Sequence, residues 1–178
     1  VTRQHPQGHF TMGVYLVDIY CKGLLHSEYF FNMNHDDYEM MVKRIDMDED
    51  LKKAAYADAH KLVYGAIDFA EAVGIDSEDS FDITKYILDE KKEEIPFAEF
   101  GRNGKHYLRA DTDEEAELYI PIIMEAIGTD FTYSIEGVTD GEVDAAEVPF
   151  GDFDFSELNY DEEEFDKMFE KLNRESQD

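Results

Sequence analysis

The feature that most constrains the fold is a run of apolar residues at helical spacing between Asp48 and Val73. Steps of three and four residues place these side chains on one face of a helix, and Gly74 follows as a stop signal. The apolar positions are Leu51, Ala55, Ala59, Leu62, Val63, Ala66, Ile67, Ala70 and Val73. Because many of them are alanine, a neighbouring sheet or helix can approach closely. The pattern therefore predicts one long amphipathic helix.

The segment before this helix has the composition of β-strands. Residues 10–21, FTMGVYLVDIYC, are mostly β-branched and aromatic, which favours a central strand. Residues 27–33 are expected to pair back as a second strand, after which Asn34 can cap a short helix. The apolar positions of that helix are Tyr38, Met41, Val42 and Ile45.

A short helix and a hairpin are predicted after the long helix. The hydroxyl of Ser80 is expected to cap the short helix. Its inward residues are predicted to be Phe81, Ile83, Tyr86 and Ile87. Residues 95–110 have two apolar arms around Gly101, Arg102, Asn103 and Gly104, and this pattern predicts a β-hairpin.

A further helix is expected over residues 111–128, with acidic residues in its first turn and Gly128 at its end. Pro121 should kink or divide it. Residues 129–137 then read as a last strand. Together these elements predict an α+β fold over residues 1–136, with one small, mostly antiparallel sheet packed on the long helix and on shorter helices.

The composition changes at Gly137. Fifteen acidic residues lie between Asp140 and Asp178, against three basic ones. Aromatic side chains are spaced among the acids, and the last part has an apolar helical face. The aromatic residues with a predicted role in partner binding are Phe153, Phe155, Tyr160, Phe165 and Phe169. We interpret residues 137–178 as an acidic extension that ends in a short amphipathic helix, which either folds back on the domain or docks on a basic partner.

The charge of the chain excludes two classes of partner. Forty-four acidic and 16 basic residues give a net charge of −28. Without a cluster of lysine and arginine, binding to nucleic acid or to an anionic membrane surface is not expected. No apolar run reaches the roughly 20 residues of a membrane-spanning helix. A single cysteine fits a reducing compartment, so the cytoplasm is the default expectation.

Asp18 and Cys21 stand out because they interrupt an apolar strand. Alternation along a strand would point them to opposite faces unless a bulge intervenes. The simplest interpretation of Asp18 is a carboxylate bound to a backbone amide, a hydroxyl or a basic side chain, and that of Cys21 is a small core residue. The catalytic alternative makes Cys21 a nucleophile activated by His60 or His26, with Asp18 nearby.

Metal-binding motifs are weak in this sequence. The histidines lack the spacing of a zinc site, and we predict no metal or other cofactor. Residues 136–147, EGVTDGEVDAAE, match a calcium loop in part. The matching positions are Asp140, Gly141, Asp144 and Glu147, whereas Val138 stands where a ligand oxygen is needed. We interpret this segment as an acidic turn.

Three segments together resemble an uncharacterised family of bacterial proteins: RQHPQGHFTMGVYLVDIYCKG, AHKLVYGAIDFAEAVGI and FGRNGKHYL. The resemblance covers residues 3–135 and implies a shared fold. It implies no activity, cofactor or catalytic residue. The chain departs from the family pattern at LLHSE and DSEDS, where the family has a Lys-Asp pair and a Pro-His pair.

The charge and the aromatic residues of the extension favour a protein-interaction or regulatory role, with a basic protein as the partner. The alternative function is a thiol- or histidine-dependent hydrolase centred on Cys21 and His60. The two hypotheses differ in the expected reactivity of the thiol, which should be slow for a core residue and fast for a nucleophile.

Overall fold

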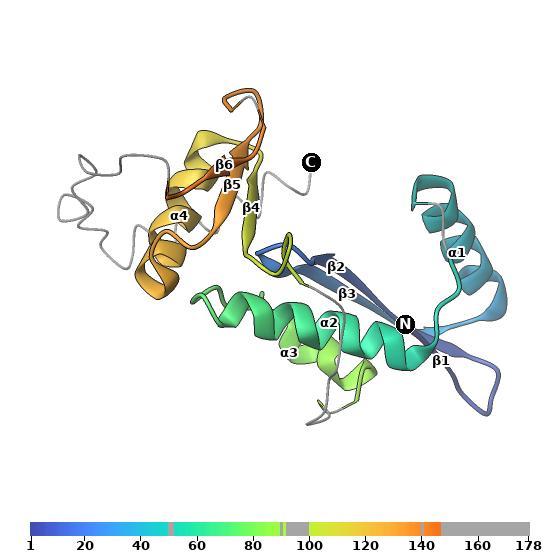
Figure 1. Ribbon diagram of the computed structural model, residues 1–178. Helices are drawn as coiled ribbons and strands as arrows, with labels where there is room; N and C mark the ends of the chain where they lie inside the picture. The colour runs from blue at the N-terminus through green and yellow to red at the C-terminus, as the bar shows by residue number, and fades with distance from the viewer. Residues whose placement is uncertain (50–51, 90, 92–99, 140, 147–178) are drawn as a thin grey trace. The chain divides into compact units, whose positions relative to one another are not determined.

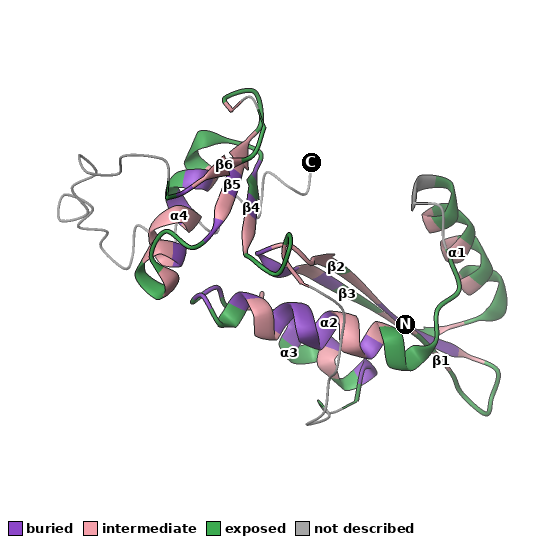
Figure 2. Ribbon diagram, viewed as in Figure 1, coloured by how far each residue is buried: buried purple, intermediate pink, exposed green. Residues whose placement is uncertain are grey.

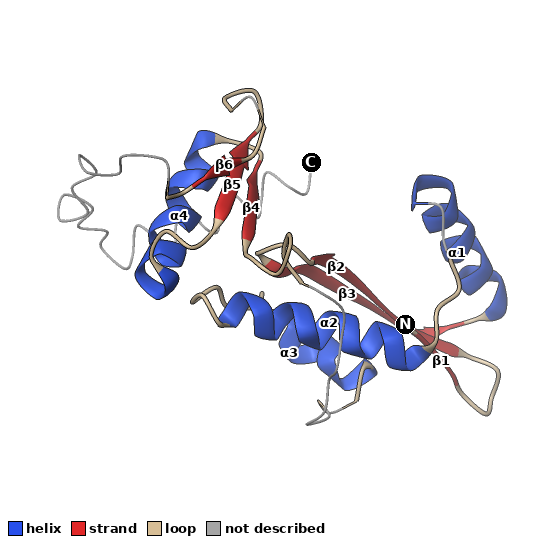
Figure 3. Ribbon diagram, in the orientation of Figure 1, coloured by secondary structure: helices blue, strands red, loops and turns tan. Residues whose placement is uncertain are grey.

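A computed structural model describes residues 1–49, 52–89, 91, 100–139 and 141–146 (Figure 1). The chain divides into two units, Val1–Glu147 and Val148–Asp178, and the second lies outside the described residues. The first unit contains helices and two three-stranded sheets, as Figure 3 shows. The predicted α+β class is confirmed, with the strands divided between two sheets where the sequence suggested one.

The first sheet is antiparallel, in the order β1 (Thr2–Gln4), β2 (Phe10–Asp18) and β3 (Gly23–Met33). The predicted pairing of the two strands is confirmed, and its register is shifted between Leu16 and Val17. The first predicted strand is three residues too long, because β2 ends at Asp18 and the chain turns back before Gly23.

The helix predicted from Asp48 to Val73 begins later than expected, and the predicted short helix before it extends to Glu49. Helix α1 spans His35–Glu49, residues 52–55 are not helical, and α2 spans Tyr56–Glu71. The expected cap of the first helix is present, because Oδ1 of Asn34 accepts a hydrogen bond from the backbone N–H of Asp37 at 2.9 Å. The expected stop at Gly74 is also present, at a φ of +82°.

Helix α2 packs on one face of the first sheet and supplies half of the core cluster (Figure 1). Its alanine-rich side lets Gly23 lie directly against Ala66 and Ala70, as the sequence predicts. Burying these apolar side chains stabilises the fold by about 25 cal/mol per Å². The core cluster comprises Leu24, Val63, Tyr64, Ile67, Phe81 and Leu88, with Val1, Tyr15 and Val17 packed against it.

The predicted short helix is present but differs in detail. Helix α3 (Phe81–Thr84) continues into the 3₁₀ turn η1 (Lys85–Ile87). The predicted cap is wrong, because the Ser80 hydroxyl does not cap the helix and bonds to Ser27 and Glu78. Ile83 and Tyr86, predicted to point inward, are exposed, whereas Thr84 and Leu88 are buried. A 3₁₀ turn has three residues per turn, which moves the inward positions by one.

The second sheet has the order β4 (Tyr107–Ala110), β5 (Thr132–Ile135) and β6 (Val143–Asp144). Strands β4 and β5 are parallel, because α4 (Asp113–Ile127) forms the crossover between them. The helix runs through Pro121 undivided. The predicted turn at 101–104 is formed, whereas most of the first arm of the predicted hairpin lies outside the described residues.

Strand β6 lies within residues 137–178, which the composition predicts to be a C-terminal extension. It pairs with β5, and Ala145 beside it is fully buried. Residues 143–145 therefore pack against the domain. The rest of the extension, from residue 147 onward, lies outside the described residues, and so do its predicted terminal helix and aromatic residues.

Candidate functional site

Asp18 stabilises the turn between β2 and β3. Its Oδ1 atom accepts hydrogen bonds from the backbone N–H groups of Tyr20, at 2.5 Å, and Cys21, at 3.0 Å. The acidic residue within the apolar run thus satisfies donors that the turn would leave unpaired. The interpretation of Asp18 as a carboxylate bound to backbone amides is confirmed. The expected separation of Asp18 from Cys21 is wrong, because Cys21 follows the end of the strand.

The Cys21 thiol is fully buried beneath this turn. Burial raises the pKa of the thiol to about 12, and the negative charge of Asp18 adds to the shift, against the opposing effect of Lys22. A nucleophilic cysteine needs the opposite, a lowered pKa and access to a substrate. The environment of Cys21 is that of a core residue.

Helix α4 is joined to the same turn by an ion pair that the sequence does not reveal. The Nζ atom of Lys22 lies 2.6 Å from Oε1 of Glu115, and only 9% of the lysine side chain is exposed. The other oxygen of Glu115 accepts a hydrogen bond from the backbone N–H of Asp111 at 2.7 Å. Burial raises the pKa of Tyr119 nearby to about 12, with smaller contributions from Glu115, Cys21 and Asp18. These contacts attach the β2–β3 turn to α4.

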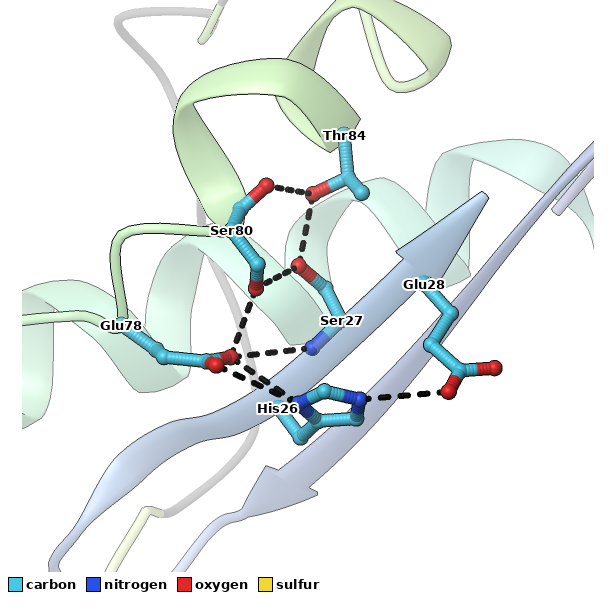
Figure 4. A network of polar contacts seen from close by, with 6 residues as sticks. All are labelled: His26, Ser27, Glu28, Glu78, Ser80 and Thr84. Atoms are coloured by element: carbon cyan, nitrogen blue, oxygen red, sulfur yellow. Dashed lines mark hydrogen bonds and ion pairs between the residues drawn. The ribbon is translucent and has the colours of Figure 1, made fainter. Parts of the chain in front are cut away.

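His26 lies between two carboxylates, as Figure 4 shows. Its Nδ1 is 3.2 Å from Oε2 of Glu78, and its Nε2 is 3.5 Å from Oε1 of Glu28. Because the carboxylates contact different ring nitrogens, one metal ion cannot bind both of them together with the ring. Within the described part of the chain no group of three or more acidic, histidine or cysteine side chains could hold a metal.

Three hydroxyl groups continue this network into the core (Figure 4). Oγ of Ser27 lies 2.7 Å from Oγ of Ser80 and 2.8 Å from Oγ1 of Thr84, and Ser80 donates to Oε2 of Glu78 at 2.6 Å. In a catalytic triad a histidine lies between the serine and the acid. Here Glu78 lies between the histidine and the hydroxyls. The network therefore attaches residues 78–84 to β3 and does not activate a serine through His26.

His60 is buried within α2, where its ring lies between those of Tyr56 and Tyr64. It precedes Ala66, which packs on Gly23, by six residues, or about 9 Å along the helix axis. His60 therefore lies in a different part of α2 from the residues that contact Gly23.

His26 lies on the other face of the first sheet. Tyr15 and Ser27, its neighbours in the ladder, contact Thr84 on the helix side, and adjacent strand residues point to opposite faces. Of the four predicted catalytic residues, the structure brings together only Asp18 and Cys21.

The described residues of the partial calcium loop make other contacts. Glu142 pairs with Arg102 at 2.6 Å, and Oδ1 of Asp144 accepts a hydrogen bond from the backbone N–H of Ala146 at 2.9 Å. Asp140 and Glu147 lie outside the described residues. Glu142 stands at the position where a calcium loop uses the backbone carbonyl and not the side chain. The Asp144 carboxylate is already bound to the backbone two residues further on.

An aromatic pair is exposed on β3, which is one of the two edge strands of its sheet. Tyr29 is 41% exposed and Phe31 is 60% exposed, and their ring centroids lie 4.8 Å apart. Gly13, the partner of Tyr29 in the ladder, directs its own N–H and C=O to Val1 of the neighbouring chain segment. The backbone of Tyr29 therefore points to the open edge of the sheet.

Helix α1 also lacks a buried side. Of its residues 35–47, whose side chains are described, none is buried, as Figure 2 shows. The ring of Tyr38 stacks on Phe10 with 4.3 Å between centroids, which attaches the helix to β2. The spacing of apolar residues predicts the apolar positions of this helix, but a local pattern does not determine that they stay half-buried.

Comparisons with models of protein families, with curated proteins and with solved structures give no match to this chain. The resemblance to a bacterial family stays a prediction. Among the described helices, none is both long and apolar enough to cross a lipid bilayer.

Proposed function

We propose that this chain is an acidic protein-interaction domain that binds a basic protein partner. The observation that carries the proposal is the exposed aromatic pair, Tyr29 and Phe31, on the edge strand β3. Tyrosine and other aromatic residues are enriched at the energetically important positions of protein interfaces.

The two halves of β3 differ in a way that folding alone does not require. The first half packs on α2 and α3 through Leu24 and Ser27, which are both buried. The second half presents two aromatic rings to solvent, where polar residues usually stand on the open part of an antiparallel sheet. A partner that covers these two rings would remove their apolar surface from water, and this burial would favour binding.

The charge supports a basic partner. The chain carries −28, and the Glu28 side chain, beside Tyr29 on the strand, is 57% exposed. A strongly acidic surface attracts a basic partner over long range and repels a second copy of itself. The alternative, a thiol hydrolase, has no favouring observation, since Cys21 is buried with a raised thiol pKa.

The test uses two defined peptides and fluorescence anisotropy. The first is a peptide of alternating leucine and lysine, which places its leucines on one side of an extended strand. The second is oligolysine with the same charge. We expect the alternating peptide to bind more tightly than oligolysine, and both affinities to fall with salt.

Removing one ring by Phe31→Ser should weaken binding of the alternating peptide by about tenfold and leave oligolysine binding unchanged. Tyr86→Ser is the matched control, because Tyr86 is exposed on η1. If the alternating peptide binds no better than oligolysine, the proposed function is wrong.

A further inference from the structure

We propose that the partner protein binds as an extended strand that adds antiparallel to the open edge of β3. This inference rests on the proposed function and specifies how the backbone of the partner is recognised. It depends on three observations: the direction of the backbone groups along this edge, the carboxylate that closes one position of it, and the different side chains on the two faces of the strand.

The backbone groups of β3 point alternately to the neighbouring strand β2 and to the open edge. The N–H of Gly13 donates to Val1 and its C=O accepts from Val1, so the residue opposite Gly13, Tyr29, does not bond to β2. Backbone groups two positions apart along a strand point the same way. The N–H of Ser27 accordingly leaves the sheet and donates to Oε2 of Glu78 at 3.2 Å (Figure 4).

The fold closes this edge at one position and leaves it open at the next. The carboxylate of Glu78 occupies the edge at Ser27, in the place where a further strand would bind. Among the described residues, none forms a hydrogen bond with the outward N–H or C=O of Tyr29. Unpaired backbone groups on an edge strand are a template for pairing with another chain. Asn32, at a φ of +53°, interrupts the extended backbone after Phe31, so the open stretch is short.

The side chains beside this open stretch predict the chemistry of the added strand. The neighbouring rings of Tyr29 and Phe31 are exposed on one face. Glu28 lies on the other face, where it is 57% exposed and contacts His26. Within the described part of the chain, neither Glu28 nor Glu78 contacts a lysine or an arginine. Because opposite residues of paired strands share a face, a segment of alternating apolar and basic residues fits both faces.

Two other arrangements fit this edge less well. Pairing with the β3 strand of a second copy would bring together two chains that each carry −28, and like charges repel. A parallel strand would need two of its residues to bond to Tyr29, whereas one residue of an antiparallel strand exchanges both bonds with it. The first sheet is itself antiparallel throughout.

The test uses the alternating peptide of leucine and lysine in two N-methylated forms, with binding followed by fluorescence anisotropy. In an antiparallel pair, the residue that exchanges backbone bonds with Tyr29 also lies on the same face as its ring. A leucine beside the ring therefore directs its N–H to Tyr29, and the N–H groups of the lysines point to solvent. All residues of one type are methylated together, because the repeating peptide could otherwise shift by two residues past a single methyl group.

Methylation of every leucine nitrogen should weaken binding by at least about tenfold, because it removes the donor to Tyr29. Methylation of every lysine nitrogen should change binding by less than about twofold. The two forms are matched controls, because they carry the same charge and, at equal numbers of leucine and lysine, the same number of methyl groups.

A second measurement follows the protein by hydrogen exchange of single backbone amides in NMR spectra. Saturation with the unmethylated peptide should slow exchange of the Tyr29 N–H by at least about tenfold. The N–H of Glu28 is the control, because it faces β2 opposite Val14 and should be slowed less.

Equal effects of the two methylated peptides overturn the inference, and so does a larger effect of lysine methylation, which indicates a parallel strand. Equal slowing of the Tyr29 and Glu28 amides overturns it as well. A free chain that sediments as a dimer with the Tyr29 amide already protected overturns it too, because a second copy then occupies the edge. If Phe31→Ser still weakens the unmethylated peptide, the proposed function survives these failures. If that peptide binds no better than oligolysine, the proposed function fails and the inference fails with it.

Discussion

Gly23 is the position where a single methyl group should cost most. It begins β3 at a φ of +73°, and a Cβ atom there would lie 2.7 Å from Cβ of Ala70 and 3.0 Å from the carbonyl oxygen of Ala66. The left-handed backbone costs a non-glycine residue about 1–2 kcal/mol. Forcing β3 and α2 apart costs about 1–3 kcal/mol more, as for other overpacked cores. Gly23→Ala should therefore destabilise the protein by about 2–5 kcal/mol.

The chain offers a control that separates the two costs. Gly8 has a φ of +86°, and a Cβ atom added to it would meet no other atom within 4 Å, so Gly8→Ala carries only the backbone cost. Urea unfolding of both variants, followed by circular dichroism, gives the difference directly. We expect Gly23→Ala to lose about 1–3 kcal/mol more than Gly8→Ala. Equal losses would refute the close packing of β3 on α2.

Three further predictions concern the β2–β3 turn. Lys22→Met should destabilise the fold by about 2–3 kcal/mol in urea unfolding. This is less than the cost of breaking a fully buried ion pair, because the Glu115 side chain keeps 19% exposure. Adding Glu115→Gln to Lys22→Met should recover part of the lost stability. Iodoacetamide should label Cys21 slowly in the folded state and rapidly in urea. In the folded state the thiol is buried, and its pKa of about 12 keeps it protonated near neutral pH. Rapid labelling of the folded protein would reverse the interpretation of Cys21 as a core residue. Stability should be highest below pH 9.0 and fall as the pH rises from there toward 12, since the folded state holds the protons of Cys21 and Tyr119 more tightly than the unfolded state does. Urea midpoints measured across this range should fall less in Cys21→Ala, and a flat profile in the parent protein would contradict the raised pKa values.

Local patterns in the sequence predict most of the elements. Apolar spacing finds α1 and α2, the acidic first turn and Gly128 find α4, and the strand composition finds the β2–β3 hairpin. These features depend on residues within a few positions of one another, so the sequence determines them by itself. The interruption between α1 and α2 is not visible in this way, because alanine and lysine at residues 52–55 have good helix propensity.

The tertiary structure decides the pairing of distant residues. Strand β4 pairs in parallel with β5 only because α4 returns the chain to the same end of the sheet. Lys22 meets Glu115 across 93 residues, and the Ser27 hydroxyl meets Thr84 across 57. Nothing in the neighbourhood of either residue in the sequence identifies its partner, because one contact follows from how α3 packs on β3 and the other from where α4 meets the β2–β3 turn. The same packing buries Cys21 and leaves Tyr29 and Phe31 exposed, and hydrophobicity alone would have placed all three in the core.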